Sequence, residues 1–288
     1  QVMLSARELS RDRLPSDAQT WVNRTLQYTH GYGVAMSPVN EVSTDGGLPV
    51  LWIQDLPPSG VIEIDRPELY YAERAGEHVI VNTETEEFDY PSGEENIFTT
   101  YEGEGGVPIG SLLRRALYAW ERADFNILIS SQLSSESRIM YHRDIQERVK
   151  RIAPFLSLDA DPYVVIHEGR LLWIQDCYTT STRYPYSNPW DTGVNYVRNS
   201  VKAVVDAYEG SVDFYIFEDE DPMIKVWDNI FPDLFKERSE MPEELLPHIR
   251  YPSDLLLVQG LVYAKYHMND PTVFYNQEDL WIRATEKY

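Results

Sequence analysis

Apolar residues recur at every third or fourth position in five stretches of the chain, a spacing that places them on one face of a helix. In the first stretch Ser16 and Gln19 have the spacing of a capping box, and Gly31 follows the predicted end. The buried face of this helix is expected to consist of Ala18, Trp21, Val22 and Leu26.

A second helix is predicted after Ser111, whose hydroxyl can cap the first turn. Its buried stripe is expected to be Leu113, Ala116, Leu117 and Trp120. The pattern over residues 135–153 predicts a third helix, with Ile145, Val149 and Ile152 as its stripe and Pro154 at its end. Asp221 followed by Pro222 predicts the start of a fourth helix, and residues 253–267 form a fifth.

Shorter stretches rich in Val, Ile, Leu and aromatic residues predict strands. A single strand is expected at residues 49–55, and the crowded stretch 84–106 is expected to be an exposed loop. Three hairpins are expected to pair residues 69–73 with 78–83, 163–167 with 171–176, and 201–206 with 212–217. Since hairpins and separate helices occur without regular βαβ alternation, the predicted fold class is α+β, with antiparallel sheet packed against several helices.

The length of the chain favours one domain over residues 1–288. The alternative is two related lobes with a boundary near residues 125–155, because the order proline, hairpin, Tyr-Pro occurs twice. Tyr90 with Pro91 closes the first series, and Tyr184 with Pro185 closes the second. Hairpins in general share a similar amino-acid composition, so the same order of residues could occur twice without a gene duplication.

The chain is strongly acidic, with 25 Lys and Arg against 47 Asp and Glu and a formal net charge of −22. A field of that sign repels phosphate backbones, so nucleic acid is not expected as a partner. The acidity is expected to keep the domain soluble, and concentration of cations is the alternative. The acidic run 218–221 has no mid-loop glycine, so a helix start is favoured there over a calcium loop.

Local catalytic motifs are missing from the sequence. It contains no phosphate-binding glycine loop and no His-Glu-x-x-His run, and its single cysteine, Cys177, has no neighbouring base that would activate a thiolate. Neither a cofactor nor a metal site is therefore predicted.

Aromatic residues are the most suggestive feature, with 20 Tyr, 7 Trp and 9 Phe. Flat amphipathic rings beside carboxylates can bind sugars, and paired carboxylates can hydrolyse them. The alternative is that these tyrosines pack loops onto the core. The candidate binding residues, all in predicted loops, are Tyr90, Tyr184, Tyr186 and Trp190.

No stretch of the sequence is suited to cross a bilayer, which takes about 20 mainly apolar residues. The longest apolar stretch, 255–264, is too short and contains Gln259 and Gly260. The polar start, residues 1–13, is not a signal peptide, and the chain is expected to be a piece of a longer protein.

Several long strings of the sequence are distinctive: Trp21–Arg24, Tyr28–Gly33, Leu51–Asp55, Phe88–Gly93, Gly110–Arg115, Arg183–Ser187 and Asn199–Tyr208. In these strings the chain resembles a bacterial family of membrane proteins, uncharacterised protein family number 0182. Cys177 departs from the family, where alanine is expected.

The resemblance implies an architecture in which several membrane-spanning segments precede a large extracytoplasmic region of this kind. It supplies no catalytic residue and no cofactor. The expected function is a binding or regulatory role at the extracytoplasmic face of the cell membrane. The expected partners are the membrane-spanning segments of the same full-length protein or another envelope component. A hydrolase acting on envelope glycans through paired carboxylates, and a cation-binding domain, are the alternatives.

Overall fold

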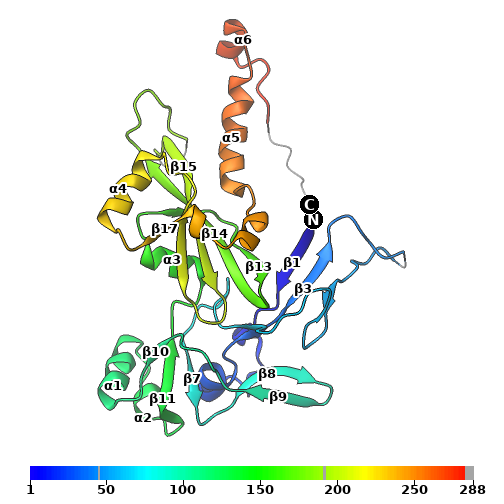
Figure 1. Ribbon diagram of the computed structural model, residues 1–288, viewed down its shortest axis with the longest axis vertical. Coiled ribbons are helices and arrows are strands. Elements are labelled where there is room, and N and C mark those ends of the chain that lie inside the picture. Colours follow the sequence, from blue (N-terminus) through cyan, green and yellow to red (C-terminus); the bar gives the residue numbers. More distant parts are fainter. Residues whose placement is uncertain (45, 191–192, 283–288) are drawn as a thin grey trace. The chain divides into compact units, whose positions relative to one another are not determined.

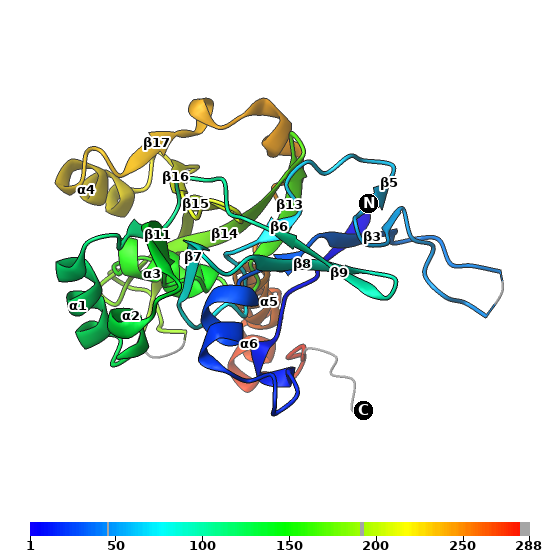
Figure 2. The ribbon, with the colours of Figure 1, turned by 90° about the horizontal axis from the view of Figure 1, so that it is seen from below.

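The computed structural model describes residues 1–44, 46–190 and 193–282 of the chain (Figures 1 and 2). Its contacts divide the chain into two compact units. Unit 1 comprises Gln1–Ala153, Pro162–Ile174 and Val204–Asp213, and unit 2 comprises Pro154–Asp161, Gln175–Ala203 and Phe214–Tyr288.

Four small antiparallel sheets lie within unit 1. The largest has the order β1-β3-β4-β5, and the second has the order β10-β11-β7. The other two are the pairs β2-β6 and β8-β9, the latter visible as a hairpin in Figure 2. Their bounds are β1 Val2–Ala6, β2 Gly31–Tyr32, β3 Val34–Pro38, β4 Ile53–Gln54, β5 Ser59–Gly60, β6 Glu68–Leu69, β7 Val79–Thr83, β8 Glu87–Ser92, β9 Glu95–Thr99, β10 Val107–Pro108 and β11 Leu133–Met140.

The helices of unit 1 are short. They are the 3-10 helix η1 (Arg11–Arg13), the π-helix η2 (Asn23–Gln27), α1 (Leu112–Glu121), α2 (Asn126–Ile129) and α3 (Ile145–Ile152). Figure 1 shows α1 and α2 together beside β10 and β11. One hydrophobic core joins η2, α1 and α2 to β7 and β11 and consists of Leu26, Ile80, Ile109, Ala119, Ile127, Leu133 and Ile139.

A six-stranded sheet with the order β12-β14-β15-β16-β17 contributes residues to both units, and β13 pairs with β14 in antiparallel register. Its last pair, β16 with β17, is parallel. The bounds are β12 Ser157–Leu158, β13 Tyr163–His167, β14 Arg170–Ser181, β15 Tyr196–Asp206, β16 Val212–Ile216 and β17 Phe235–Glu237. The helices of unit 2 are α4 (Pro222–Ile230), η3 (Arg238–Glu240), η4 (Glu243–His248), α5 (Ser253–Tyr266) and α6 (Pro271–Asn276).

The predicted α+β class is confirmed, because antiparallel sheets and separate helices make up the described chain. The hairpins around Gly169 and Gly210 form as β13–β14 and β15–β16, and both glycines have the positive φ that such turns favour. Helix α1 is capped by Ser111, which accepts a hydrogen bond from the Arg114 N–H. Helix α4 starts at the predicted Asp221–Pro222 pair, and the helix predicted over residues 253–267 forms as α5.

Several predicted elements are wrong in extent or pairing. The capping box at Ser16 does not form, because Gln19 donates its amide to the Leu14 carbonyl (2.8 Å) and the helix begins only at Trp21. The strand expected at residues 49–55 is reduced to Ile53–Gln54. The stretch 84–106 is not a loop throughout, since it contains the β8–β9 hairpin.

Pairing in the β10-β11-β7 sheet explains two further corrections. The expected hairpin of residues 69–73 with 78–83 is absent, because β6 pairs with β2 while β7 pairs with β11. Residues 135–140 of the helix expected over residues 135–153 belong instead to β11, and α3 begins at Ile145 after the cap Asp144. Proline, hairpin and Tyr-Pro therefore do not recur as a structural series.

Candidate functional site

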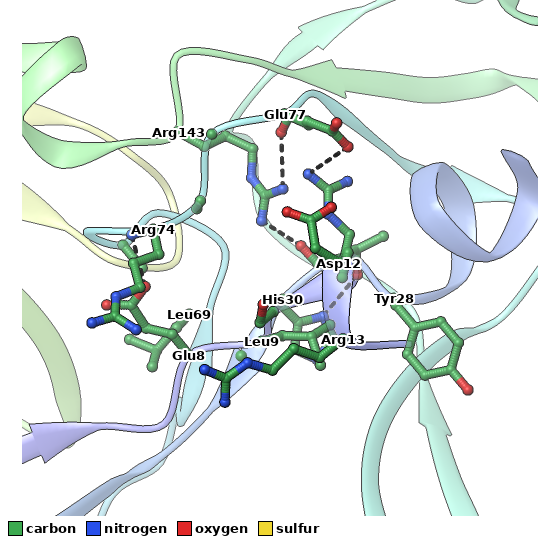
Figure 3. Close-up of a pocket in the computed structure, with 17 residues that line it drawn as sticks. Glu8, Leu9, Asp12, Arg13, Tyr28, His30, Leu69, Arg74, Glu77 and Arg143 are labelled. Carbon is green, nitrogen blue, oxygen red and sulfur yellow. Dashed lines mark hydrogen bonds and ion pairs between the residues drawn. The ribbon is translucent and has the colours of Figure 1, made fainter. Parts of the chain in front are cut away.

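Unit 1 contains a cavity of about 250 Å³, shown in Figure 3. Its wall combines the N-terminal segment before and within η1, the residues that follow η2, and the segment before β7, with Arg143 from the β11–α3 connection. The lining residues are Glu8–Arg13, Tyr28–Gly31, Leu69, Ala72, Arg74–Glu77 and Arg143.

Arg143 holds three segments of this wall together. Its guanidinium donates to the carbonyl oxygens of Tyr70 (2.6 Å), Glu77 (3.2 Å) and Thr29. Burial, with the nearby charge of Arg11, lowers the pKa of Arg143 to about 9, so the side chain stays cationic at neutral pH. A buried cation bonded to three carbonyl dipoles is a clamp for the backbone.

The acids in the wall are already in contact with protein donors. Glu8 accepts the N–H of Arg74 (2.7 Å), and burial raises the pKa of Glu8 above its usual range. Glu77 and Asp12 both pair with Arg24, at 2.9 and 3.2 Å. Glycan hydrolysis needs one carboxyl group that donates a proton and a second at a set separation, so it stays a prediction for this cavity.

Two residues of this wall, Thr29 and His30, belong to a network that we call the His30 cluster: Thr29, His30, Tyr70, Glu87 and Asp89. The Glu87 carboxylate accepts hydrogen bonds from the hydroxyls of Thr29 (2.5 Å) and Tyr70 (2.9 Å) and from the Tyr101 N–H (3.1 Å). His30 Nδ1 lies 2.8 Å from the Thr29 hydroxyl, and Nε2 lies 3.3 Å from Asp89.

The hydrogen-bond partners of His30 favour its doubly protonated form. Thr29 gives its only proton to Glu87 and therefore accepts from Nδ1, while Nε2 faces a carboxylate and also donates. Burial alone lowers the pKa of His30, but the hydrogen bonds to Asp89 and Glu87 outweigh it, and the pKa is raised. A doubly protonated imidazole can donate a proton but cannot act as a general base.

Glu68 adds a third carboxyl group near this network. It is buried, its Oε2 has no hydrogen-bond partner within the described residues, and burial raises its pKa. Glu68 does not line the cavity. The cluster therefore joins β2, β6 and β8 from inside the protein.

The most unusual exposed surface of unit 1 is the apolar face, which we define as Leu112, Leu113, Leu117 and Trp120 of α1 with Phe125 and Ile129 at α2. Three of these side chains, Leu113, Leu117 and Trp120, were predicted to be buried, and that prediction is wrong. Their exposed fractions are 71%, 61% and 89%, because α1 turns Ala119 toward the core instead.

Helix α5 of unit 2 is a second apolar surface. Apolar side chains are distributed around this helix, with Asp254, Gln259 and Lys265 among them, and Leu256, Leu261, Val262, Tyr263 and Tyr266 are at least half exposed. A helix that is hydrophobic on all sides is normally covered in the finished protein. Within the described residues, no helix is long and apolar enough to cross a membrane.

The four predicted binding residues fall in different places. Tyr90 is on β8 in unit 1, where its ring lies 4.8 Å from that of Tyr32. The other three belong to the β14–β15 connection in unit 2. Tyr184 stacks on Tyr196 (5.3 Å), Tyr186 is fully exposed, and the backbone N–H of Trp190 donates to the Val194 carbonyl. A shared sugar site for these residues remains a prediction.

Sequence reasoning did not single out the His30 cluster or the apolar face. His30, Glu68 and Glu87 are far apart along the chain, and only the fold brings them together, because β2 pairs with β6 and contacts β8. Cys177 is fully buried on β14, as an unreactive thiol would be. Among described residues, no group of three His, Cys, Asp or Glu side chains is placed to hold a metal.

Comparison with known proteins gives one consistent match. The model of the family described as "Uncharacterised protein family (UPF0182)" matches residues 1–288. A UPF0182 protein of Pelotomaculum thermopropionicum is 52% identical over 290 residues, which is 100% of this chain and 32% of that protein. One from Desulforamulus reducens is 53% identical over 291 residues and 31% of its own length. The chain thus spans about a third of these relatives, and no solved structure matches it.

Proposed function

We propose, since this chain belongs to the uncharacterised protein family UPF0182, that it is the extracytoplasmic binding domain of a longer bacterial membrane protein. Its apolar face binds the membrane-spanning part of the same protein. The exposure of Trp120, Leu113 and Leu117 on one side of α1 is the observation that carries this proposal.

Exposing an apolar surface of this kind to water is unfavourable in free energy. Fully burying one Leu or Phe side chain is worth about 1.5–3 kcal/mol, so six large side chains on neighbouring helices can support a stable contact. The relatives are about three times as long as this chain, which leaves a large amount of polypeptide to cover the face. Helix α5 would be covered in the same way.

Trp120 provides the test. In the 288-residue chain its fluorescence should be quenched by acrylamide, and subtracting the spectrum of Trp120→Phe isolates its signal from the other six tryptophans. In the full-length protein in bilayers, Trp120 should be protected from acrylamide and also from brominated lipids. Quenching by brominated lipids would mean that the face meets lipid, and unchanged acrylamide access would mean that nothing covers it. Either result would overturn the proposal.

A second variant controls for folding and for self-association. Leu113→Ser with Leu117→Ser should change the free energy of unfolding of the 288-residue chain by less than about 0.5 kcal/mol per site, because both side chains are exposed. The same pair should restore acrylamide access to Trp120 in the full-length protein. If the 288-residue chain sediments as a dimer that this pair dissociates, a second copy is the partner and the proposal fails.

A further inference from the structure

Unit 2 contains a cavity of about 390 Å³ between the start of β15, the end of η4 and the start of α5. We call it the cationic cavity, because four of its five charged lining residues are basic: Arg198, Lys202, Arg238 and Arg250, against Glu218. Over the whole chain the balance is reversed, with 47 acidic and 25 basic residues. The cavity is therefore a local exception to the charge of the protein.

A buried, fixed cation lies at one side of this cavity. Lys202 is only 3% exposed, and its amine donates to Asp176 and to the Asn199 side chain (2.5 Å). Asp176 neutralises much of this charge, so Lys202 mainly orders the wall. It also holds Asn199, whose amide donates to the Cys177 carbonyl (3.2 Å).

The arginines are differently placed. Arg250 pairs with Asp161 at 3.5 Å, with both side chains half exposed. Arg238 lies over the ring of Phe217, with its guanidinium carbon 4.9 Å from the ring centroid. In the part of the chain that the structure describes, neither Arg238 nor Arg198 has a carboxylate within ion-pair distance. Two guanidinium groups without an ion pair among the described residues thus line the cavity, and Arg198 also donates a hydrogen bond to the Tyr196 side chain.

Guanidinium groups bind phosphate and carboxylate through pairs of parallel hydrogen bonds, and two of them together match a doubly charged oxyanion. The space is far larger than the roughly 10–15 Å³ that one water needs, so it can hold a ligand larger than a bare ion. Beside the arginines lie the Phe217 ring and Tyr251, whose hydroxyl donates to Gln259 (2.5 Å). These groups can contact the remainder of an organic phosphate.

We propose that the cationic cavity binds a phosphate monoester, with Arg198 and Arg238 on the phosphate group. The phosphate can belong to a soluble metabolite or to a lipid headgroup, since both present the same dianion. This site is separate from the apolar face and does not depend on what covers that face.

Calorimetric titration of the 288-residue chain with glucose 6-phosphate, and with glucose at matched ionic strength, tests the proposal. Glucose 6-phosphate should bind and glucose should not. Arg238→Gln should weaken binding at least about tenfold, since one charge-assisted pair is lost. Arg183→Gln removes the same charge from an exposed position of unit 2 outside the cavity, and it should change the affinity by less than about twofold.

Co-sedimentation with vesicles distinguishes the two sources of phosphate. Binding to phosphatidate but not phosphatidylcholine vesicles, lost in Arg238→Gln and kept in Arg183→Gln, would support the proposal and assign the phosphate to lipid. Equal weakening by both variants would show a nonspecific charge effect and overturn it. The proposal would also be overturned if the parent chain bound neither glucose 6-phosphate nor phosphatidate vesicles. The melting temperature of Arg238→Gln should equal that of the parent chain, which checks that the variant is folded.

Discussion

At the scale of single residues, the buried charges of this chain are defined by the donors and acceptors around them. His30 has an acceptor at each ring nitrogen, and Lys202 has a carboxylate and an amide oxygen at its amine. Removing water from such groups is costly, and only complete pairing offsets the cost. Both residues should therefore respond strongly to changes in protonation or in their partners.

The stability of the fold should depend on pH through His30. Its pKa is raised in the folded chain above the unfolded value of about 6.5, so its stabilising contribution is complete below that value and is lost as pH rises through the folded pKa. Urea unfolding between about pH 6 and pH 9 should show the free energy of unfolding falling more steeply in the parent chain than in His30→Asn. Identical slopes would show that the pKa of His30 is not raised in the fold.

Lys202→Met should destabilise the chain, because it leaves Asp176 buried without its counter-charge. The expected loss is about 3–5 kcal/mol in chemical denaturation. The double variant Lys202→Met with Asp176→Leu removes both charges and should recover most of that loss. If the double variant were no more stable than the single one, lost packing of the lysine stem would be the cause instead of the unpaired carboxylate.

At the scale of elements, local signals predicted the starts of helices better than their buried faces. Asp221–Pro222 and Ser111 are confirmed because a cap depends only on the next few residues. The stripe on α1 was wrong because periodicity finds an apolar face without saying what covers it. Residues 135–140 were assigned to a helix although their partner is β7, which lies more than fifty positions earlier in the chain.

Asp221 should stabilise α4 and the strands around it together. Its carboxylate accepts from Thr179, Ser200 and Tyr196 (each 2.5 Å) and from the Met223 N–H (3.0 Å). Burial alone raises the pKa of Asp221, but these hydrogen bonds outweigh it and lower the pKa. Asp221→Ala should therefore cost more than about 2 kcal/mol, because it removes a cap and leaves hydroxyls unpaired.

A matched control for Asp221 is the exposed cap of α6. Within the described residues, the Asp270 carboxylate accepts hydrogen bonds from the Thr272 and Val273 N–H groups alone, so Asp270→Ala should cost about 1 kcal/mol or less. Because the folded pKa of Asp221 is depressed, its contribution is present above the unfolded pKa of about 3.9 and is lost as pH falls through the folded value. Denaturation at neutral and acidic pH checks both statements, and equal losses for the two variants would contradict the role of the three hydroxyls.

At the scale of the whole molecule, the sequence indicated the fold class and the family but not the sites. The cationic cavity gathers residues from positions 197 to 259, and the His30 cluster gathers residues from positions 29 to 89. Neither set has a local spacing that a motif could capture. The aromatic residues drew attention by their abundance, yet abundance does not say which rings share a surface.

The path of the chain predicts how the whole molecule unfolds. Three segments of unit 1 alternate with three of unit 2, so the chain passes between the units five times, and β14 and β15 each contribute to both. Neither unit can then lose its strands without disrupting the other. We expect one thermal transition, with a calorimetric enthalpy equal to the van't Hoff enthalpy. Two resolved transitions, or independent folding of a fragment ending at Ala153, would show that the units are autonomous.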